Sequence, residues 1–308
     1  DGSVHGPAPI VPDEPVAQAG LVPEWLVLQF AEPVRDAAER AALLTRAPLD
    51  IRVNALKAKA RDVRPLFPEA EGFAGLSHAL RLPEGTSVEQ SAAYREGLIE
   101  VQDIGSQMIV QACAAAPGMT VIDLCAGAGG KTLGLAAAMQ GKGRLIAADV
   151  NRDRLSRLPE RAARAGADAI ETLLLDAGRE TDRLAPLAGT ADVVLVDAPC
   201  SGTGTWRRNP EARWRLTSER LARLVGEQAR ILDLAAPLVK PGGRLVYAVC
   251  ALTDAEGRGQ VDAFLGRHPG WQPLDPEVPV GRRHGEGVLL TPAHDGTDGF
   301  FIAAMLMS

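Results

Sequence analysis

The sequence predicts a doubly wound α/β domain with a mostly parallel sheet, preceded by a small α+β unit. From about residue 104 onward, short apolar runs alternate with longer amphipathic stretches, and a glycine-rich turn directly follows the first run. Before residue 101 the runs are shorter and alternate between apolar and polar residues. Continuous apolar strands that alternate with helices are typical of parallel sheets covered on both faces.

The first hundred residues are predicted to contain a tail and a small subdomain. Residues 1–20 are rich in proline, glycine and alanine, which is typical of a flexible tail. Residues 22–46 are predicted to form one or two short amphipathic helices, broken near Pro33. Residues 50–101 combine short alternating runs with one short helix at 61–67. The predicted units are a tail (1–20), a helical and α+β subdomain (21–100) and the α/β domain (101–308).

The α/β domain is predicted to contain seven strands and four main helices. Each expected strand is a short apolar run, and each expected helix has apolar residues at helical spacing. The expected strands are 120–125, 144–150, 169–176, 191–199, 243–250, 287–292 and 299–307. The expected helices are 105–116, 131–140, 152–166 and 217–239.

Composition excludes some classes of protein. The 308 residues carry a net charge of −6, which counts against a surface coated with basic residues but allows a local basic channel. No apolar run reaches the roughly 18 residues that a membrane span requires. The four cysteines include no CxxC pair, and the five histidines are scattered, so we expect no metal site and no disulfide scaffold. A reducing cytoplasm is therefore the expected location.

A glycine-rich turn over residues 123–132 (DLCAGAGGKT) follows the first predicted strand. Glycines allow close approach of the backbone to a ligand, and the following helix offers free N–H groups to an anion, either a phosphate or a methionine carboxylate. A dinucleotide-binding dehydrogenase would need its third glycine closer than Gly134. A P-loop NTPase would need glycine where Cys125 stands.

Two carboxylates follow the next strands. Asp149 closes the second strand and is a candidate to accept hydrogen bonds from a ribose diol, or else it caps a helix. Asp176 closes the third strand and is a candidate to contact an adenine amino group, or else it is solvated. Arg154 lies one helical turn beyond Asp149 and is a further candidate neighbour of the ligand.

Two cysteines end neighbouring predicted strands. Cys200 lies in the segment DAPCSGTG, together with Asp197, and Cys250 closes the segment VYAVC. Ligands of such sheets bind beyond the carboxyl ends of the strands, so both thiols are expected to face one cavity. The alternative is that each cysteine is a small buried apolar residue, which is our interpretation of Cys113 in its helix and of Cys125 under the glycine turn.

Taken together, these motifs resemble the Sun/RsmB-like family of RNA cytosine-5 methyltransferases. The resemblance covers about residues 22–308 and depends on the combination of motifs. It implies a small RNA-handling subdomain, a Rossmann-like methyltransferase domain and S-adenosylmethionine as cofactor. The matching segments are IRVNAL (51–56), VQDIGSQ (101–107), GGKT (129–132), DAPCSGTG (197–204), RRNPEARW (207–214), GRLVYAVC (243–250) and DGFF (298–301).

The resemblance also implies roles for individual residues. Cys250 would attack C6 of the cytosine, because a thiolate adduct activates the unreactive C5, and Cys200 would assist product release. Asp197 would bind the N3/N4 edge of the base, and Lys131 would lie near the cofactor carboxylate or the base. A lowered pKa of Cys250 is expected. The implied cofactor-binding residues are Cys125, Ala126, Gly127, Gly129, Gly130, Lys131, Asp149, Arg154, Asp176 and Asp197.

The sequence departs from the family pattern on both sides of the expected nucleophile. Val249 and Ala251 stand where the family usually has threonine and serine. These lost hydroxyls motivate one alternative, a non-catalytic RNA-binding or ribosome-assembly factor that keeps the fold. A DNA cytosine-5 methyltransferase is a second alternative. It would use the cysteine after proline alone, and would usually follow it with glutamine rather than Ser201.

The expected partner is RNA, most simply ribosomal RNA, and the expected state is a monomer that binds no membrane and no metal. Residues 206–215 interleave arginines with Trp206 and Trp214. Arginine neutralises phosphate and aromatic rings stack on unpaired bases, so this segment is a candidate RNA contact. The alternative is a structural loop with solvated arginines. A row of arginines from Arg152 to Arg164 is interpreted as a solvated helix face.

Overall fold

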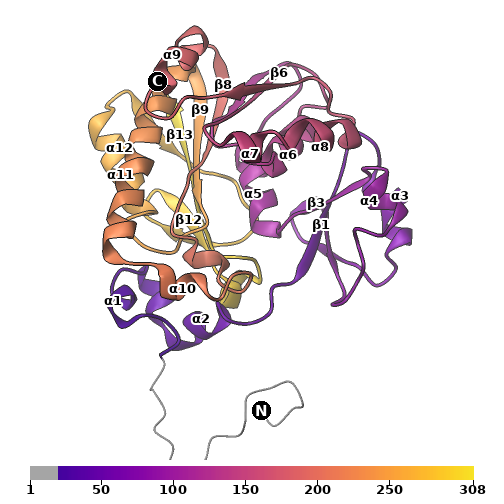
Figure 1. The fold of residues 1–308 in the computed structure, drawn as a ribbon, viewed down its shortest axis with the longest axis horizontal. Helices are drawn as coiled ribbons and strands as arrows, with labels where there is room; N and C mark the ends of the chain where they lie inside the picture. The colour runs from indigo at the N-terminus through magenta and orange to yellow at the C-terminus, as the bar shows by residue number, and fades with distance from the viewer. Residues whose placement is uncertain (1–19) are drawn as a thin grey trace, which may run out of the picture.

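The computed structural model describes residues 20–308, so the predicted tail lies outside the described residues except for Gly20. Figure 1 shows a large α/β domain beside a smaller sheet unit. The strands are β1 (Leu49–Val53), β2 (Glu71–Phe73), β3 (Leu76–Leu82), β4 (Ile99–Val101), β5 (Thr120–Asp123), β6 (Arg144–Asp149), β7 (Ile170–Leu174), β8 (Ala191–Asp197), β9 (Val239–Val249), β10 (Trp271–Leu274), β11 (Arg282–His284), β12 (Gly287–Leu290) and β13 (Phe300–Met307). The helices are α1 (Glu24–Val27), α2 (Ala37–Ala42), α3 (Ala60–Val63), α4 (Ala92–Arg95), α5 (Ile104–Ala112), α6 (Gly130–Ala138), α7 (Arg152–Leu155), α8 (Leu158–Ala165), α9 (Glu180–Leu184), α10 (Ala212–Arg215), α11 (Ser218–Ala235), α12 (Arg258–Arg267) and α13 (Pro292–Asp295).

The large sheet has the strand order β11-β12-β13-β9-β8-β5-β6-β7, with β10 paired to β13. The five central strands from β9 to β7 are parallel, and the remaining strands add to one edge in antiparallel fashion. The chain order reverses between β5 and β8, where a doubly wound sheet opens a crevice beyond its strand ends. The predicted α/β class and Rossmann-like arrangement are therefore confirmed.

Alternate side chains of the central strands enter two cores on opposite faces of the sheet. Ile122 and Val194 pack under α11 and α12, whereas Val121 and Val193 pack under α5, α6 and α8. This alternation is the period-two geometry of a strand, and because both faces are covered, both sets are apolar. The continuous apolar runs that predicted these strands therefore result from the packing of helices on both faces of the sheet.

Residues 21–100 do not pack as one unit. The small sheet, of order β2-β3-β1-β4, encloses its own apolar core over residues 51–99. The preceding helices instead join the core of the large domain, where the Phe30 ring meets the Trp206 ring edge-on at 5.9 Å. The backbone N–H of Ala31 also donates to the carbonyl of Leu252. Residues 22–44 thus extend the large domain, and residues 49–101 form the separate subdomain.

The small sheet is fixed to α8 by polar side chains. Asn54 Nδ2 donates to the carbonyls of Gly97 and Ala165, both at 2.8 Å. Arg161 and Arg164 form ion pairs with buried Glu100 of β4, so our interpretation of these two arginines as a solvated helix face is wrong. The reason is that β4 supplies a buried carboxylate that the local sequence around α8 does not reveal.

The predicted helix at 152–166 is two helices, α7 and α8. Pro159 lies in the first turn of α8, where its missing N–H costs no helical hydrogen bond, so the second helix begins there. None of the helices within residues 20–308 is both long enough and apolar enough to cross a membrane.

Candidate active site

Three neighbouring strands carry the predicted reactive residues to one edge of the sheet. Asp123 ends β5, Asp197 ends β8, and Cys250 directly follows β9. Because β5, β8 and β9 are adjacent and parallel, their carboxyl ends open into the same crevice. The topology therefore brings together residues that are up to 127 positions apart in the sequence.

The glycine turn after β5 approaches this crevice with its backbone. Gly129 has φ +84° and precedes α6, and an added Cβ there would lie 2.2 Å from Leu158 Cδ1. At Gly130, the first residue of α6, an added Cβ would meet no atom within 4 Å apart from its chain neighbours and its own helix backbone. Glycine at 129 is required by packing, whereas Gly130 leaves open space over the helix N-terminus, where an anionic group is favoured.

A first cavity, of about 490 Å³, lies between the strand ends and α11, and we call it the α11-side cavity. Asp149 lines it and accepts hydrogen bonds from the backbone N–H groups of Gly127 and Asn151, each at 2.7 Å. The Arg154 guanidinium lies over Gly127, where an added Cβ would be 3.1 Å from its Nη2. Asp149 therefore has both oxygens fixed at the cavity wall, with further lone pairs that can accept ligand hydroxyls.

A second cavity, of about 430 Å³, lies towards α5, and we call it the α5-side cavity. Asp123, Lys131 and Arg208 are among its lining residues. Four residues line both cavities, so the two spaces meet beside the same side chains. They are Cys125, Arg154, Asp197 and Cys250.

The two cysteines form a close pair at this junction. Cys200 Sγ and Cys250 Sγ are 3.3 Å apart, within hydrogen-bond range for sulfur. The hydrogen bond from Cys200 lowers the pKa of Cys250, an effect that the nearby Lys131 ammonium reinforces and that burial opposes. The same hydrogen bond, together with burial, raises the pKa of Cys200 well above its usual range. The arrangement therefore favours a Cys250 thiolate that accepts a hydrogen bond from a Cys200 thiol.

Lys131 and Asp197 form an ion pair at the junction, with Nζ and Oδ2 2.5 Å apart. Burial lowers the pKa of Lys131, but the charge of Asp197 and its hydrogen bond outweigh burial, so the net shift is upward. Asp123 lies beneath the pair, 1% exposed, and accepts a hydrogen bond from Thr132 Oγ1 at 2.6 Å. Burial raises the pKa of Asp123 to about 7, so the carboxyl adds little negative charge beside the ion pair at lower pH.

Asp176 lies outside this group. It is exposed two residues beyond β7 and does not line the α11-side cavity, whereas the neighbouring Leu175 does. The chain turns away here, since the N–H of Arg179 donates to the Asp176 carbonyl. The expected contact between Asp176 and an adenine therefore has no support from its position.

The predicted RNA segment 206–215 divides into a buried and an exposed half. Trp206 is 0% exposed and Arg207 is buried in an ion pair, so neither can stack on or neutralise RNA, and that prediction is wrong for both. Arg208 lines the α5-side cavity. Trp214 is 51% exposed, with the Arg213 guanidinium 5.0 Å from its ring centroid, and it keeps the geometry of a stacking surface.

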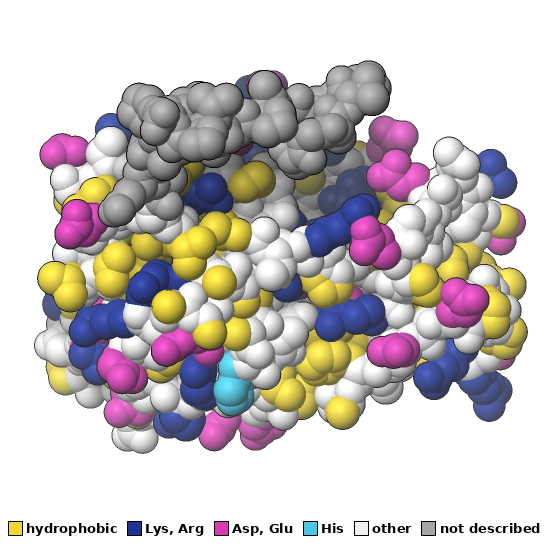
Figure 2. Space-filling model, turned by 90° about the horizontal axis from the view of Figure 1, so that it is seen from below, with side chains coloured by type: hydrophobic (Ala, Val, Ile, Leu, Met, Phe, Trp, Pro, Cys, Tyr) yellow, Lys and Arg dark blue, Asp and Glu magenta, His cyan; other side chains and the backbone are white. Residues whose placement is uncertain are grey.

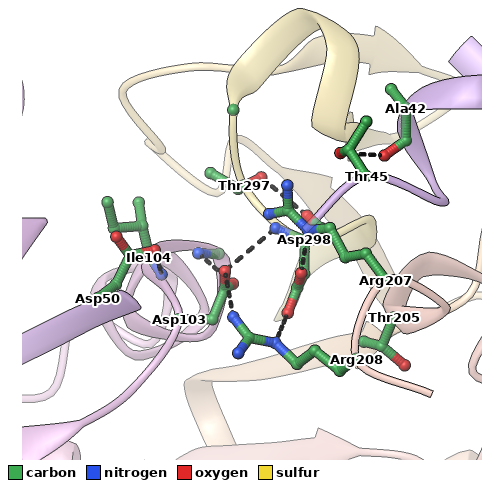
Figure 3. Close-up of polar contacts among 12 residues, drawn as sticks. Ala42, Thr45, Asp50, Asp103, Ile104, Thr205, Arg207, Arg208, Thr297 and Asp298 are labelled. Carbon is green, nitrogen blue, oxygen red and sulfur yellow. Dashed lines mark hydrogen bonds and ion pairs between the residues drawn. The ribbon is translucent and has the colours of Figure 1, made fainter. Parts of the chain in front are cut away.

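Figure 3 shows the polar network that holds the buried half of this segment. Asp298, 2% exposed, accepts hydrogen bonds from Arg207 Nε at 2.5 Å and from Arg208 Nε. Its backbone N–H donates to Asp103, which lies just before α5. Burial and the charge of Asp298 raise the pKa of Asp103 to about 6. The network thus connects the wall of the α5-side cavity to the turn before β13.

Glycine makes a close backbone contact beside this network. The N–H of Gly299 donates to the carbonyl of Gly204 at 2.8 Å, and an added Cβ on Gly204 would lie 2.0 Å from the Gly299 carbonyl oxygen. The segments DAPCSGTG and DGFF therefore meet because each has glycine at the contact. The loop that carries Cys200 is held from this side by the start of β13.

Sequence reasoning missed one buried residue behind the loop that carries Cys200. Glu256 accepts hydrogen bonds from Ser201, the residue after Cys200, and from Gln228 of α11. Its spacing from Cys250 matches no motif, so only the packed structure reveals it. Within residues 20–308, no cluster of His, Cys, Asp and Glu has the form of a metal site.

The chain matches the family model "16S rRNA methyltransferase RsmB/F" over residues 110–306. It is 35% identical over 294 residues to a probable ribosomal RNA small subunit methyltransferase B of Synechocystis, covering 91% of this chain and 66% of that protein. It is 41% identical over 209 residues to the Thermus thermophilus ribosomal RNA small subunit methyltransferase B, covering 67% of this chain and 50% of that protein. The chain thus spans about two thirds or less of the length of these relatives.

Solved structures share the fold over nearly the whole chain. The crystal structure of PH0851 superimposes with a TM-score of 0.87 at 30% identity, covering 95% of this chain and 69% of that chain. A methyltransferase homologue from Pyrococcus horikoshii superimposes with a TM-score of 0.78 at 25% identity, covering 92% of this chain and 93% of that chain.

Proposed function

The chain belongs to the RsmB/F family of 16S rRNA methyltransferases, and from this premise we propose that it transfers a methyl group from S-adenosylmethionine to C5 of a cytosine in RNA. The observation that carries the proposal is the pair of thiols 3.3 Å apart at the junction of two cavities. One cavity can hold the cofactor and the other a base. A thiol nucleophile at that junction suits the carbon chemistry of C5.

The α11-side cavity and its junction with the α5-side cavity have the groups that S-adenosylmethionine requires. Asp149 lines the α11-side cavity and offers carboxylate oxygens to the ribose hydroxyls. Gly130 lines the adjoining α5-side cavity, and the open space over it at the α6 N-terminus suits the methionine carboxylate. Cys125, Ala126, Gly127 and Gly129 form the turn between these two groups. Arg154 lies over that turn. When bound, the cofactor supplies an electrophilic methyl group on a sulfonium sulfur.

Replacing Asp149 by asparagine is expected to weaken S-adenosylmethionine binding about 10- to 100-fold. Hydrogen bonds to a charged group are worth about 1.5–3 kcal/mol, and an asparagine N–H₂ would oppose one of the two backbone N–H donors. Isothermal titration calorimetry measures the change, with exposed Asp153→Asn in α7 as the control. A dissociation constant within twofold of wild type would remove Asp149 from the cofactor site.

The cysteine pair divides the chemistry at the base. The Cys250 thiolate forms a bond to C6, the electrons of the C5=C6 bond move towards C5, and C5 takes up the methyl group. Asp197 accepts hydrogen bonds at the N3/N4 edge and stabilises the protonated ring during the attack. The C5 proton then leaves to a base, the C5=C6 bond re-forms, and the bond between Cys250 Sγ and C6 breaks. The net release of one proton balances the charge lost by the sulfonium.

Replacing Cys200 by alanine is expected to trap the covalent RNA adduct and to lower turnover by about 10²-fold or more. The Cys200 thiol donates a hydrogen bond to the departing Cys250 thiolate, and a positioned proton donor typically contributes about 10²–10⁴-fold. Denaturing gel electrophoresis with labelled RNA detects the adduct. The Cys200→Ala/Cys250→Ala double variant is the control and should form none. Full turnover by Cys200→Ala without any adduct would contradict the role.

RNA is proposed to reach the junction through the α5-side cavity, past Arg208. The exposed Trp214, with Arg213 over its ring, is proposed as a separate RNA contact. Figure 2 views the side of the molecule on which α1, α2 and α10 lie in Figure 1. On the described part of this face, Lys and Arg are interspersed with hydrophobic and acidic side chains. This pattern favours local contacts with an exposed, unpaired base rather than contacts spread along a duplex.

The reaction is tested by incubating unmodified ribosomal RNA with the protein and S-adenosylmethionine and measuring 5-methylcytidine by mass spectrometry. We expect 5-methylcytidine in the RNA and no methylation of a DNA duplex of matching sequence. Absence of product from both unmodified ribosomal RNA and assembling small-subunit particles, with the cofactor bound, would favour a non-catalytic RNA-binding factor instead.

A further inference from the structure

A buried carboxylate, Glu256, lies behind the loop that carries Cys200. Its side chain is 0% exposed, and each of its hydrogen-bond donors is a neutral group. Oε1 accepts from the Ser201 backbone N–H at 2.7 Å and from Gln228 Nε2 at 3.1 Å. Oε2 accepts from the Ser201 and Thr253 hydroxyls at 2.6 and 2.8 Å. In the part of the chain that the structure describes, no Lys or Arg pairs with this carboxylate.

The charges around the thiol pair are placed asymmetrically. Both Glu256 oxygens contact Ser201, the residue next to Cys200. Lys131 instead lines the α5-side cavity together with Cys250, and Cys200 does not line that cavity. A negative charge without a paired cation therefore lies on the Cys200 side, whereas Cys250 lies beside the Lys131–Asp197 ion pair. An anion disfavours a neighbouring thiolate and a cation favours it.

We propose that Glu256 is a positioning residue that keeps the proton of the thiol pair on Cys200 and so makes Cys250 the nucleophile. The role of Cys250 as nucleophile rests on the proposed function, whereas the position of the proton can be measured without RNA. In the resting pair, the Cys200 thiol donates to the Cys250 thiolate across 3.3 Å. When Cys250 leaves C6, the same hydrogen bond receives the returning thiolate, so the pair gains and loses no proton over the cycle.

The other ionisable groups at the junction act on the pair in both directions. After the hydrogen bond between the thiols, burial and the charge of Cys250, the charge of Glu256 is a further cause that raises the pKa of Cys200. Glu256 also acts to raise the pKa of Cys250, but less than Asp197 does. Asp197 acts to raise the pKa of Cys250, but it is paired with Lys131, which acts to lower it. Tyr247 is a neutral neighbour, since burial raises the pKa of its phenol and Oη donates to the Glu256 backbone carbonyl at 2.7 Å. Glu256 is thus the buried charge on the Cys200 side that no cation offsets.

Replacing Glu256 by glutamine removes the negative charge and keeps the hydrogen-bond geometry. Oε1 accepts only from N–H groups, whereas Oε2 accepts only from hydroxyls, which can also act as acceptors. An amide with its oxygen at the Oε1 position and its nitrogen at the Oε2 position keeps all four contacts. Glu256→Gln therefore removes the charge alone, whereas Glu256→Leu removes the charge and the contacts together.

The experiment measures alkylation of each cysteine by iodoacetamide in the folded, RNA-free protein, because iodoacetamide reacts with the thiolate. Initial rates at Cys200 and Cys250 are read by peptide mass spectrometry across a pH series. The variants are wild type, Glu256→Gln, Glu256→Leu and, as a control, Glu89→Gln, which changes an exposed glutamate. 5-Methylcytidine formation is measured on the same samples.

We expect Cys250 to react faster than Cys200 in wild type, and the ratio of their rates to fall at least about threefold in Glu256→Gln, as expected for loss of one nearby charge. In Glu256→Gln, the pH profile of the total alkylation rate of both cysteines should shift to lower pH, while 5-methylcytidine formation slows. Loosening of the loop alone would not produce this combination. An unchanged ratio in Glu256→Gln would overturn the proposal, whatever happens to activity. If wild type forms no 5-methylcytidine but the ratio still falls, the proposed function fails and the placement of the proton stands.

Discussion

Replacing Cys250 by alanine is expected to reduce 5-methylcytidine formation by at least about 10³-fold, because the variant lacks the atom that bonds to C6. The Cys250 side chain lines both cavities, and its sulfur lies 3.3 Å from that of Cys200. Cofactor binding should change little, since Asp149 and the glycine turn are untouched. The measurement combines mass spectrometry of the RNA with calorimetry of cofactor binding.

Cys113→Ala is the matched control for this variant. Cys113 is buried next to α5, and its Sγ donates to the Ile109 carbonyl, away from both cavities. We expect it to keep activity. If Cys250→Ala still formed product, Cys250 could not be the nucleophile, and Cys200 would become the candidate.

Replacing Asp298 by alanine is expected to lower the free energy of unfolding by about 3–5 kcal/mol, the range found when one partner of a buried ion pair is removed. Arg207, whose side chain is 3% exposed, would lose its carboxylate and remain buried without compensation. Arg208, at the wall of the α5-side cavity, would lose its hydrogen bond to Asp298 and keep the longer ion pair with Asp103, at 3.6 Å. Chemical denaturation measures the change, and the network concerned is drawn in Figure 3.

Asp262→Ala is the control for Asp298→Ala. Asp262 lies exposed on α12, where such a substitution usually changes stability by less than about 0.5 kcal/mol. A loss of less than about 1 kcal/mol for Asp298→Ala would mean that water or other groups readily replace the carboxylate. The network would then not hold the loop.

Much of the fold could be predicted because the central strands are buried on both faces and are therefore apolar throughout. The exceptions have a physical cause. β10 contains Pro273, and β11 consists of two arginines and a histidine, so neither has the apolar run of a strand. β10 pairs with a strand farther along the chain, where Leu274 lies opposite Ala304, whereas β11 forms a local hairpin with β12, where His284 lies opposite Gly287. α12 includes Gly259 and Gly266, which obscure its helical pattern.

The site residues at the ends of the strands were also predictable, because parallel strands place the residues that follow them at one edge of the sheet. This reasoning brings Asp197, Cys200 and Cys250 together, as the structure does. It does not reach Glu256, whose position depends on the path of the chain after Cys250. Nor does it separate buried Trp206 from exposed Trp214, since both lie in the same arginine-rich segment.

The residues on both sides of Cys250 help to explain a departure from the family pattern. Val249 and Ala251 are each 0% exposed and belong to the apolar core under α11 and α12. Hydroxyls at these positions would need buried partners, which costs stability unless each is hydrogen-bonded. The apolar residues fit the core here, while Cys200 and Lys131 act on the Cys250 thiolate from other elements.

The contact between Gly204 and Gly299 has a consequence for the order of assembly during translation. β9 leaves the ribosome well before residues 298–307, yet β13 pairs with β9 and its preceding turn holds the Cys200 loop. Since domains begin to fold from the N-terminus during synthesis, the nascent sheet first exposes β9 as an open edge. The thiol pair can reach its final geometry only after β13 has emerged and closed that edge.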